Sequence, residues 1–529
     1  MMRSPMRPVR AGYPALFALL VGAVPSLAHA DVLGRLLTAA DDGGGGGGSA
    51  APPGPDDLAS WAGPARATTL PDLLVTTVRQ APALATARID IEIAAARIEQ
   101  TMSRDDWTLR AQAYGQSAAG FFSGFRIDRS TTVGVTADIG RALPSGGTVT
   151  LHVGSEYARV SSPIDSSINT NWSDELNVQL TQPLMRGRGR ALYDASERRA
   201  TLSRDVSVLA RRAAAIAAIQ TVVSAYWDLV LAERQVAITQ ASLDLARERL
   251  RITQIGTDGG KVPRSEIPAV QQIIATREED LLSAELAVLE RSIVLRRAVG
   301  LPIGAGELAL RVTPELATRD QAWDLGALTE RAYAASPELA QLATQEASTQ
   351  LDIEVTENGL LPRLDAALTL GPRVQNEQFG SAWRDIARPG AFAIVGSLTY
   401  EQALGQENIK GRTRELRASR QRLAMSAVDL RAQIAQTMAR AVAQLELARR
   451  RVLLSERAIA LASENIQVEG DRFNLGKATN FDVLNRQEEL RQAELRRSQA
   501  MIDGHKAETV VQALTGDLLP GFGITIDDR

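Results

Sequence analysis

The chain has 529 residues, a formal net charge of −3 and an aromatic content of only 4%. Such a nearly neutral balance gives no electrostatic attraction to nucleic acid, so nucleic acid is not expected as a partner. The chain has no cysteine, which excludes zinc–thiolate sites, disulfides, cysteine nucleophiles and a lipid anchor on an N-terminal cysteine. A composition poor in aromatics and rich in Ala, Leu, Gln, Glu and Arg favours long helices over a packed α/β enzyme.

Residues 1–30 have the pattern of a secretory signal peptide, with three arginines, an apolar stretch at 13–24 and the cleavage site Ala28-His29-Ala30. The alternative is an uncleaved N-terminal anchor. No other segment is expected to approach the roughly 18 apolar residues of a spanning helix, so any further membrane crossing requires strands closed into a barrel. Residues 31–66 contain six consecutive glycines and several prolines, which indicates a disordered linker.

The remainder of the chain carries a duplicated pattern. Pro82-Ala83-Leu84 corresponds to Pro337-Glu338-Leu339, an offset of 255, and Gly260-Lys261 corresponds to Gly476-Lys477, an offset of 216. In both copies a large apolar residue recurs every seven positions with a small residue three positions later, which favours left-handed supercoiling of paired helices. Nine matched positions at the offset of 216 run from Val222 to Leu250 in the first copy. We therefore expect a first repeat at 67–300, a joining segment at 301–324, a second repeat at 325–516 and a C-terminal tail at 517–529.

Each repeat is expected to combine one very long helix with two helices of about half that length. The long patterns cover 190–255 and 406–473 without an internal proline, and each would extend about 100 Å. The shorter patterns cover 72–104, 267–299, 325–359 and 482–515. Tip turns are expected at 256–266 and 474–481, where the helical patterns reverse.

Alternating apolar and polar residues predict strands at 106–183 in the first repeat and at 362–402 in the second. One example is the stretch from Val133 to Ile139, in which every second residue is apolar. Strands of this kind, in a secreted chain with 100 Å helices, favour a transmembrane barrel. A soluble β-sandwich is the alternative.

Three segments carry a family resemblance: residues 180–184 (LTQPL), residues 226–231, and residues 472–476 (RFNLG) followed by Asp482-Val483-Leu484. By their order and spacing, residues 70–516 resemble the TolC family of outer-membrane efflux proteins. The resemblance implies a mainly α protein with membrane β-structure, in which a homotrimer forms a periplasmic α-helical tunnel and a shared β-barrel in the outer membrane. It implies a passive exit duct without enzyme activity or cofactor, working with a periplasmic adaptor and an inner-membrane pump in a tripartite efflux or type I secretion system.

The resemblance also places a pore gate at the tip turns. Asp482 stands at the family's acidic pore position and Asn485 at the second, while Glu266 corresponds to Asp482 in the first turn. The alternative role for Asp482 is to cap its helix. Where the family latch uses a Tyr and an Arg, this chain has Phe473 and Ala478, so we expect a closed state held by other contacts or a weaker one.

The tip residues Gly260, Lys261, Gly476 and Lys477 are the expected contacts for the adaptor; plain solvated turns are the alternative. The two offsets differ by 39 residues, which fall in the strand region of the first repeat. These residues can hold an extra hairpin, giving six strands per protomer and eighteen in a trimer rather than the family's twelve. The alternative is a hairpin that folds outside the membrane.

Three other classes of protein remain as competitors. A periplasmic adaptor would carry one hairpin rather than two matched copies, and a secreted coiled-coil scaffold would need no strands. An enzyme is disfavoured because the histidines, His29, His152 and His505, are isolated in the sequence. Gly259-Gly260-Lys261 lacks the spacing of a phosphate loop.

Overall fold

The computed structural model describes residues 66–122, 125–161, 169–260, 262–304, 307–312, 323–377, 381–385 and 389–524. All of these belong to one compact unit, residues 59–529. The expected signal peptide, nearly all of the expected linker and Lys261 lie outside the described residues.

Two helices dominate the structure, α6 (Ala195–Asp258) with 64 residues and α11 (Glu407–Asn474) with 68 residues. They lie where the long helices were expected, and at about 1.5 Å per residue each is roughly 100 Å long. The short helix α5 (Arg190–Tyr193) precedes α6. Heptad residues such as Val222 and Leu229 of α6 and Met438 of α11 are buried.

The expected single helices at 72–104 and 325–359 are wrong, because each is broken in two. The first consists of α3 (Leu70–Gln80) and α4 (Pro82–Met102), followed by the 3-10 turn η1 (Ser103–Asp105). The second consists of α8 (Leu325–Ala335) and α9 (Pro337–Asn358). Each break precedes a proline, which lacks a backbone donor and disfavours the helical conformation of the residue before it.

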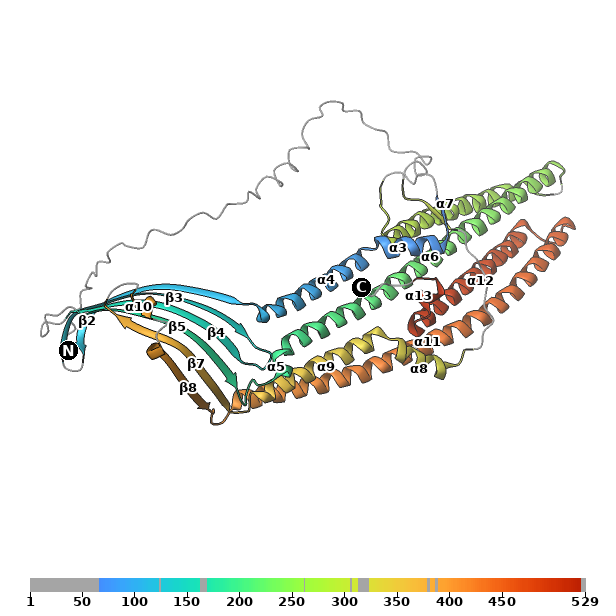
Figure 1. The fold of residues 1–529 in the computed structure, drawn as a ribbon. Coiled ribbons are helices and arrows are strands. Elements are labelled where there is room, and N and C mark those ends of the chain that lie inside the picture. Colours follow the sequence, from blue (N-terminus) through green and yellow to red (C-terminus); the bar gives the residue numbers. More distant parts are fainter. Residues whose placement is uncertain are drawn as a thin grey trace, which may run out of the picture. The chain divides into compact units, whose positions relative to one another are not determined.

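The other helices fold back on the long ones. Helix α7 (Glu266–Val299) pairs with α6, and α12 (Asn480–Thr515) pairs with α11, so that two hairpins point away from the sheet (Figure 1). A two-stranded parallel sheet joins β1 (Arg66–Thr68) to β6 (Leu310–Val312). The start of the expected C-terminal tail forms α13 (Leu518–Gly521).

The largest core cluster lies where α3, α6, α7, α12 and α13 meet. It includes Leu73, Tyr226, Leu295 and Leu518, all nearly inaccessible to solvent. We expected no segment beyond the N-terminus to have the composition of a membrane-spanning helix. This expectation is wrong, because α6 contains an 18-residue window with a mean hydropathy of 1.5. Half of that window is buried inside the protein, so its apolar residues are explained by packing in this core.

Six antiparallel strands form one sheet at the other end of the helices, in the order β2-β3-β4-β5-β7-β8 (Figure 1). Their bounds are β2 Thr108–Phe122, β3 Phe125–Ala142, β4 Thr148–Ser161, β5 Asn169–Pro183, β7 Arg363–Asn376 and β8 Phe392–Glu401. The helix α10 (Ser381–Asp385) and the turn η2 (Pro389–Ala391) lie between β7 and β8. Four strands come from the first repeat and two from the second, as the extra 39 residues allowed.

One face of this sheet is apolar across all six strands. Directly paired residues share a face, and one complete row reads Leu109, Ile139, Leu151, Val178, Leu370 and Ile394. On β8, Phe392 and Tyr400 bracket about 26 Å of strand, comparable with the roughly 25 Å apolar band of membrane barrels. Leu109 and Ile394 are about 70% exposed, so no other part of the described chain covers the apolar face at these two residues.

The opposite face is polar. Arg110, Asp138, His152 and Asn177 form one row of paired residues on it. His152 bridges two carboxylates, with Nδ1 2.5 Å from Asp138 Oδ1 and Nε2 2.9 Å from Glu175 Oε1. This histidine is therefore part of a polar network rather than isolated. An apolar face opposite a polar face is the pattern of a barrel wall between lipid and an aqueous lumen.

Candidate functional site at the helical tips

The two hairpins end in turns built on equivalent glycines. Gly260 has φ +70° and Gly476 has φ +71°, in the left-handed region that glycine adopts without strain. The Gly260 N–H donates to the Thr257 carbonyl at 3.0 Å, and the Gly476 N–H donates to the Phe473 carbonyl at 2.9 Å. The duplication detected in the sequence is thus repeated in backbone geometry.

Asp482 caps helix α12. Its carboxylate accepts from the Thr479 N–H at 2.8 Å and from the Thr479 hydroxyl at 2.7 Å, and Thr479 Oγ1 lies 3.3 Å from the Asp482 N–H. This reciprocal arrangement is a capping box. The hydrogen bonds from Thr479, first that of its backbone, hold the pKa of Asp482 below its ordinary value, so the carboxylate is charged. The capping alternative is therefore present, and it leaves Asp482 solvent-accessible.

A buried arginine reaches from the first repeat to the second. Arg249 of α6 is 7% exposed, and its Nε donates to Asn480 Oδ1 of α12 at 2.8 Å. Its guanidinium lies 3.9 Å from the centre of the Phe473 ring, at the end of α11. Burial lowers the pKa of Arg249, and its Nη2 is buried without a hydrogen-bond partner among the described residues. A cation held by an aromatic face and one amide joins the two tips.

Asn480 is the centre of this cluster, which we call the tip latch: Arg249, Thr253, Glu266, Phe473 and Asn480. Besides Arg249, Asn480 Oδ1 accepts from the Thr253 hydroxyl at 3.1 Å, and its Nδ2 donates to Glu266 Oε2 at 3.2 Å. Asn480 is 1% exposed. The two hairpins are therefore tied together by contacts that differ from the Tyr–Arg latch of the family.

The structure brings only some of the expected gate residues together. Glu266 and Phe473 lie in the tip latch, whereas Asp482 lies at the adjacent cap and Asn485 is exposed on α12. Sequence reasoning missed Arg249, Thr253 and Asn480. The sequence carried one signal for Arg249. It is a charged residue at the edge of the heptad stripe, and its counterpart 216 residues later is the uncharged Asn465.

The expected adaptor contacts Gly260, Gly476 and Lys477 are exposed, and Lys261 lies outside the described residues. His505, the isolated histidine of α12, is a packed residue: its ring stacks on Trp227 of α6 at 4.2 Å. Within the described ranges, no group of three or more His, Asp or Glu side chains is placed to hold a metal ion.

Two helices of about 100 Å extend from a sheet that has one apolar and one polar face. This arrangement is typical of the subunits of outer-membrane channels. Residues 73–301 match the family model described as outer membrane efflux protein. The matched segment covers the first repeat, which is thus similar to the TolC-like outer-membrane channels. No curated protein sequence matches the chain.

Solved channels share the fold at low identity. The CmeC outer membrane channel of Campylobacter jejuni has 12% identity and a TM-score of 0.61, covering 85% of this chain and 86% of its own. VceC of Vibrio cholerae has 14% identity and a TM-score of 0.59, with 85% and 96% covered. The open state of the Neisseria gonorrhoeae MtrE channel has 16% identity and a TM-score of 0.59, with 85% and 89% covered. The expected fold class, a helical tunnel joined to barrel strands, is confirmed.

Proposed function

We propose that the protein is one protomer of a homotrimeric exit duct that serves a tripartite efflux pump or a type I secretion system. The observation that carries this proposal is the pair of equivalent helical hairpins, tied by the tip latch and extending from a sheet with a lipid-type face. Three protomers would supply twelve helices to a periplasmic tunnel, in which the latch holds the narrow end closed.

The exposed tips suit a docking role for a periplasmic adaptor, which would link the duct to an inner-membrane pump. Lys477 and its glycine neighbour Gly476 are exposed beyond the end of α11, and a side chain added at Gly476 would enter open space. Their equivalents in the first repeat, Gly260 and Lys261, would give a trimer six similar tips. Such repetition fits an adaptor that contacts each hairpin in the same way.

Asp482 is the proposed source of cation preference at the closed end. Its carboxylate is charged and accessible while it caps α12, so the capping role and the pore role are compatible. Three copies around a narrow opening would concentrate negative potential, with Asn485 as a neutral second position.

The experiment is fractionation of the cell envelope, an unheated gel of the outer-membrane fraction, and recording of the purified protein in planar bilayers. We expect a trimer band and cation-selective conductance. The chain has no native cysteine, so the variant Lys477→Cys carries a single thiol at the tip. We expect this thiol to cross-link to an adaptor. Recovery from the soluble periplasm would contradict the channel proposal, and anion selectivity would contradict the acidic ring.

A further inference from the structure

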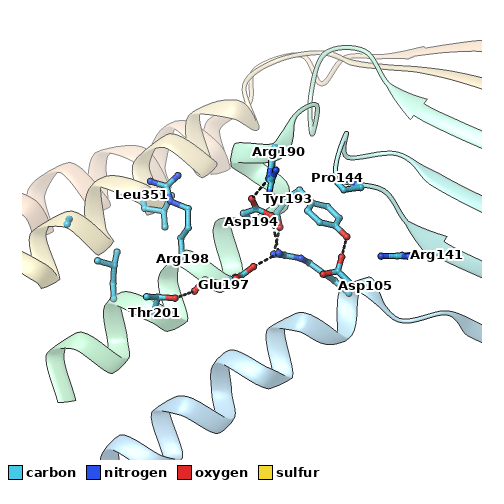
Figure 2. A pocket seen from close by; sticks show the side chains of 13 residues that line it. Asp105, Arg141, Pro144, Arg190, Tyr193, Asp194, Glu197, Arg198, Thr201 and Leu351 are labelled. Atoms are coloured by element: carbon cyan, nitrogen blue, oxygen red, sulfur yellow. Dashed lines mark hydrogen bonds and ion pairs between the residues drawn. The ribbon is translucent and has the colours of Figure 1, made fainter. Parts of the chain in front are cut away.

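A pocket of about 620 Å³ lies where the sheet meets the helices (Figure 2). Its walls come from η1, the end of β3, α5, the first turns of α6, and α9. Four arginines and three carboxylates line it, so the pocket carries an excess of one positive charge. Neither the tip latch nor the proposed duct mechanism uses this pocket.

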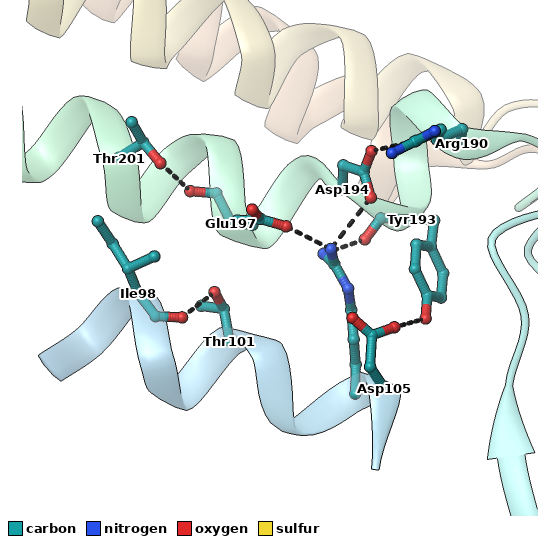
Figure 3. A network of polar contacts seen from close by, with 9 residues as sticks. Ile98, Thr101, Asp105, Arg190, Tyr193, Asp194, Glu197 and Thr201 are labelled. Carbon is teal, nitrogen blue, oxygen red and sulfur yellow. Dashed lines mark hydrogen bonds and ion pairs between the residues drawn. The ribbon is translucent and has the colours of Figure 1, made fainter. Parts of the chain in front are cut away.

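An internal network pairs the carboxylates of the pocket (Figure 3). Arg104 Nη2 lies 3.0 Å from Asp194 Oδ1 and 2.5 Å from Glu197 Oε2, and its Nη1 donates to the Tyr193 carbonyl at 2.6 Å. The Tyr193 hydroxyl donates to Asp105. Arg104 thus pairs with two of the three carboxylates, and Asp105 has the neutral Tyr193 hydroxyl as its partner, so the four arginines still exceed the three carboxylates by one charge.

Two pocket arginines have no such partner. Neither Arg141 nor Arg198 makes a hydrogen bond or ion pair with the side chains of the described ranges, whereas Arg190 pairs with Asp194 at 3.0 Å. Arg141 Nε is buried and lacks a hydrogen-bond partner in the described part of the chain. Because burying an unpaired donor is unfavourable, the pocket is incomplete without an acceptor.

One wall of the pocket lies at the helical end of the apolar sheet face. Arg141 lies two residues after Ile139 and pairs with Val149, so it shares the face of the apolar rows. The adjacent loop places exposed Leu184 and Met185 beside the exposed arginines at 186 and 188. Arginines at the edge of an apolar band are typical of a membrane–water interface.

We propose that this pocket binds the phosphate of an anionic phospholipid in the inner leaflet of the outer membrane. Arg141 and Arg198 supply the charge, because a guanidinium offers paired donors that match phosphate oxygens. The acyl chains lie on the apolar face beside Ile139, which a free phosphate could not exploit. The inference rests on the proposed function for the placement of the sheet in the membrane and of the helices in the periplasm.

The test is native mass spectrometry of the purified trimer in detergent, titrated with phosphatidylglycerol. We expect up to three tightly bound lipids per wild-type trimer. The double variant Arg141→Gln/Arg198→Gln should bind phosphatidylglycerol about 30-fold more weakly, since each basic residue near a membrane surface contributes about 1 kcal/mol. The variant Arg141→Lys/Arg198→Lys, which keeps the charge, should retain most of the binding.

The matched control is Arg440→Gln/Arg457→Gln, which removes the same charge from exposed positions far along α11. Equal loss in both double variants would show diffuse attraction and overturn the proposal, as would displacement of the lipid by equimolar inorganic phosphate. Conductance of the same samples separates the two proposals. A wild type that conducts but binds no phosphatidylglycerol contradicts the lipid site alone, whereas a wild type without trimers or conductance contradicts the proposed duct.

Discussion

At the scale of single residues, the two tips show where the repeats have diverged. Asp482 and Glu266 occupy equivalent positions, yet Asp482 caps its own helix while Glu266 accepts a hydrogen bond from the other repeat. Arg249 and Asn480 have no like counterpart in the other copy. A contact between unlike residues can join the hairpins in only one way, which gives the tip a defined closed arrangement.

Removing Asn480 should loosen this arrangement. Asn480→Ala deletes the partner of Arg249 Nε and leaves a buried cation without its side-chain acceptor. An unsatisfied buried charged donor costs about 2 kcal/mol, so the open state should be favoured by about 30-fold. Single-channel recording of the purified trimer in planar bilayers measures this as longer or more frequent opening.

Asn474→Ala is the matched control, since Asn474 is exposed at the end of α11 in the same turn. It should conduct like the wild type. If Asn480→Ala opens no more often than this control, the tip latch does not hold the channel closed. A thermal unfolding curve for each variant distinguishes a looser tip from a misfolded protein.

At the scale of elements, α6 of the first repeat and α12 of the second pack through an unusual pair. The His505 ring stacks on Trp227 with an interplanar angle of 4°. Beside it, Lys506 Nζ lies 2.6 Å from Asp228 Oδ1 and bridges the same helices. The His505 Nε2 is buried without a partner in the described part of the chain, and burial lowers the pKa of this histidine.

This packing predicts a loss of stability in mild acid. The unfolded chain binds a proton at the ordinary histidine pKa near 6.5, whereas the folded chain resists protonation. Stability should therefore be complete above about pH 6.5 and fall as the pH drops from that value through the lower folded pKa. The variant His505→Phe keeps a stacking ring without titration, so its melting temperature should fall less than that of the wild type.

Thermal unfolding in detergent between about pH 5 and about pH 8 gives the comparison. The informative quantity is the difference between wild type and His505→Phe at each pH, because other groups titrate in both proteins. A difference that stays constant over this range would show that folding does not change the protonation of His505.

At the scale of the whole molecule, the sheet raises the question of how wide the barrel is. The row from Leu109 to Ile394 runs through all six strands without a break in register. The extra hairpin is thus part of the apolar surface, which favours eighteen strands in a trimer over twelve. Strands β2 and β8 are the edges of the sheet, and pairing them between protomers would close the barrel.

We expect a barrel about 36 Å across between strand axes for eighteen strands, against about 24 Å for twelve, at a spacing of about 4.8 Å and a tilt of about 40°. Electron microscopy of the trimer viewed along its axis measures this diameter directly. A ring of the smaller diameter, with one hairpin of each protomer lying outside it, would contradict the eighteen-stranded barrel.

Much of this architecture follows from the sequence alone, because its signals are local. Seven-residue spacing specifies long supercoiled helices, two-residue alternation specifies strands with a lipid-type face, and repetition of both reveals the duplication. The sequence also contains the cause of the two helix breaks, because Pro82 and Pro337 each lack a backbone donor and disfavour a helical conformation in the residue before them. The 39 surplus residues indicated the extra hairpin without deciding whether it joined the sheet.

Only the tertiary structure decided which residues meet across the repeats. Arg249 and Asn480 are 231 residues apart, and no local pattern links them. The pocket of Arg141 and Arg198 likewise exists only because the end of a strand, the start of α6 and α9 converge. Periodicity fixes which face of each element is apolar, whereas the pairing of polar side chains depends on how the elements are brought together in space.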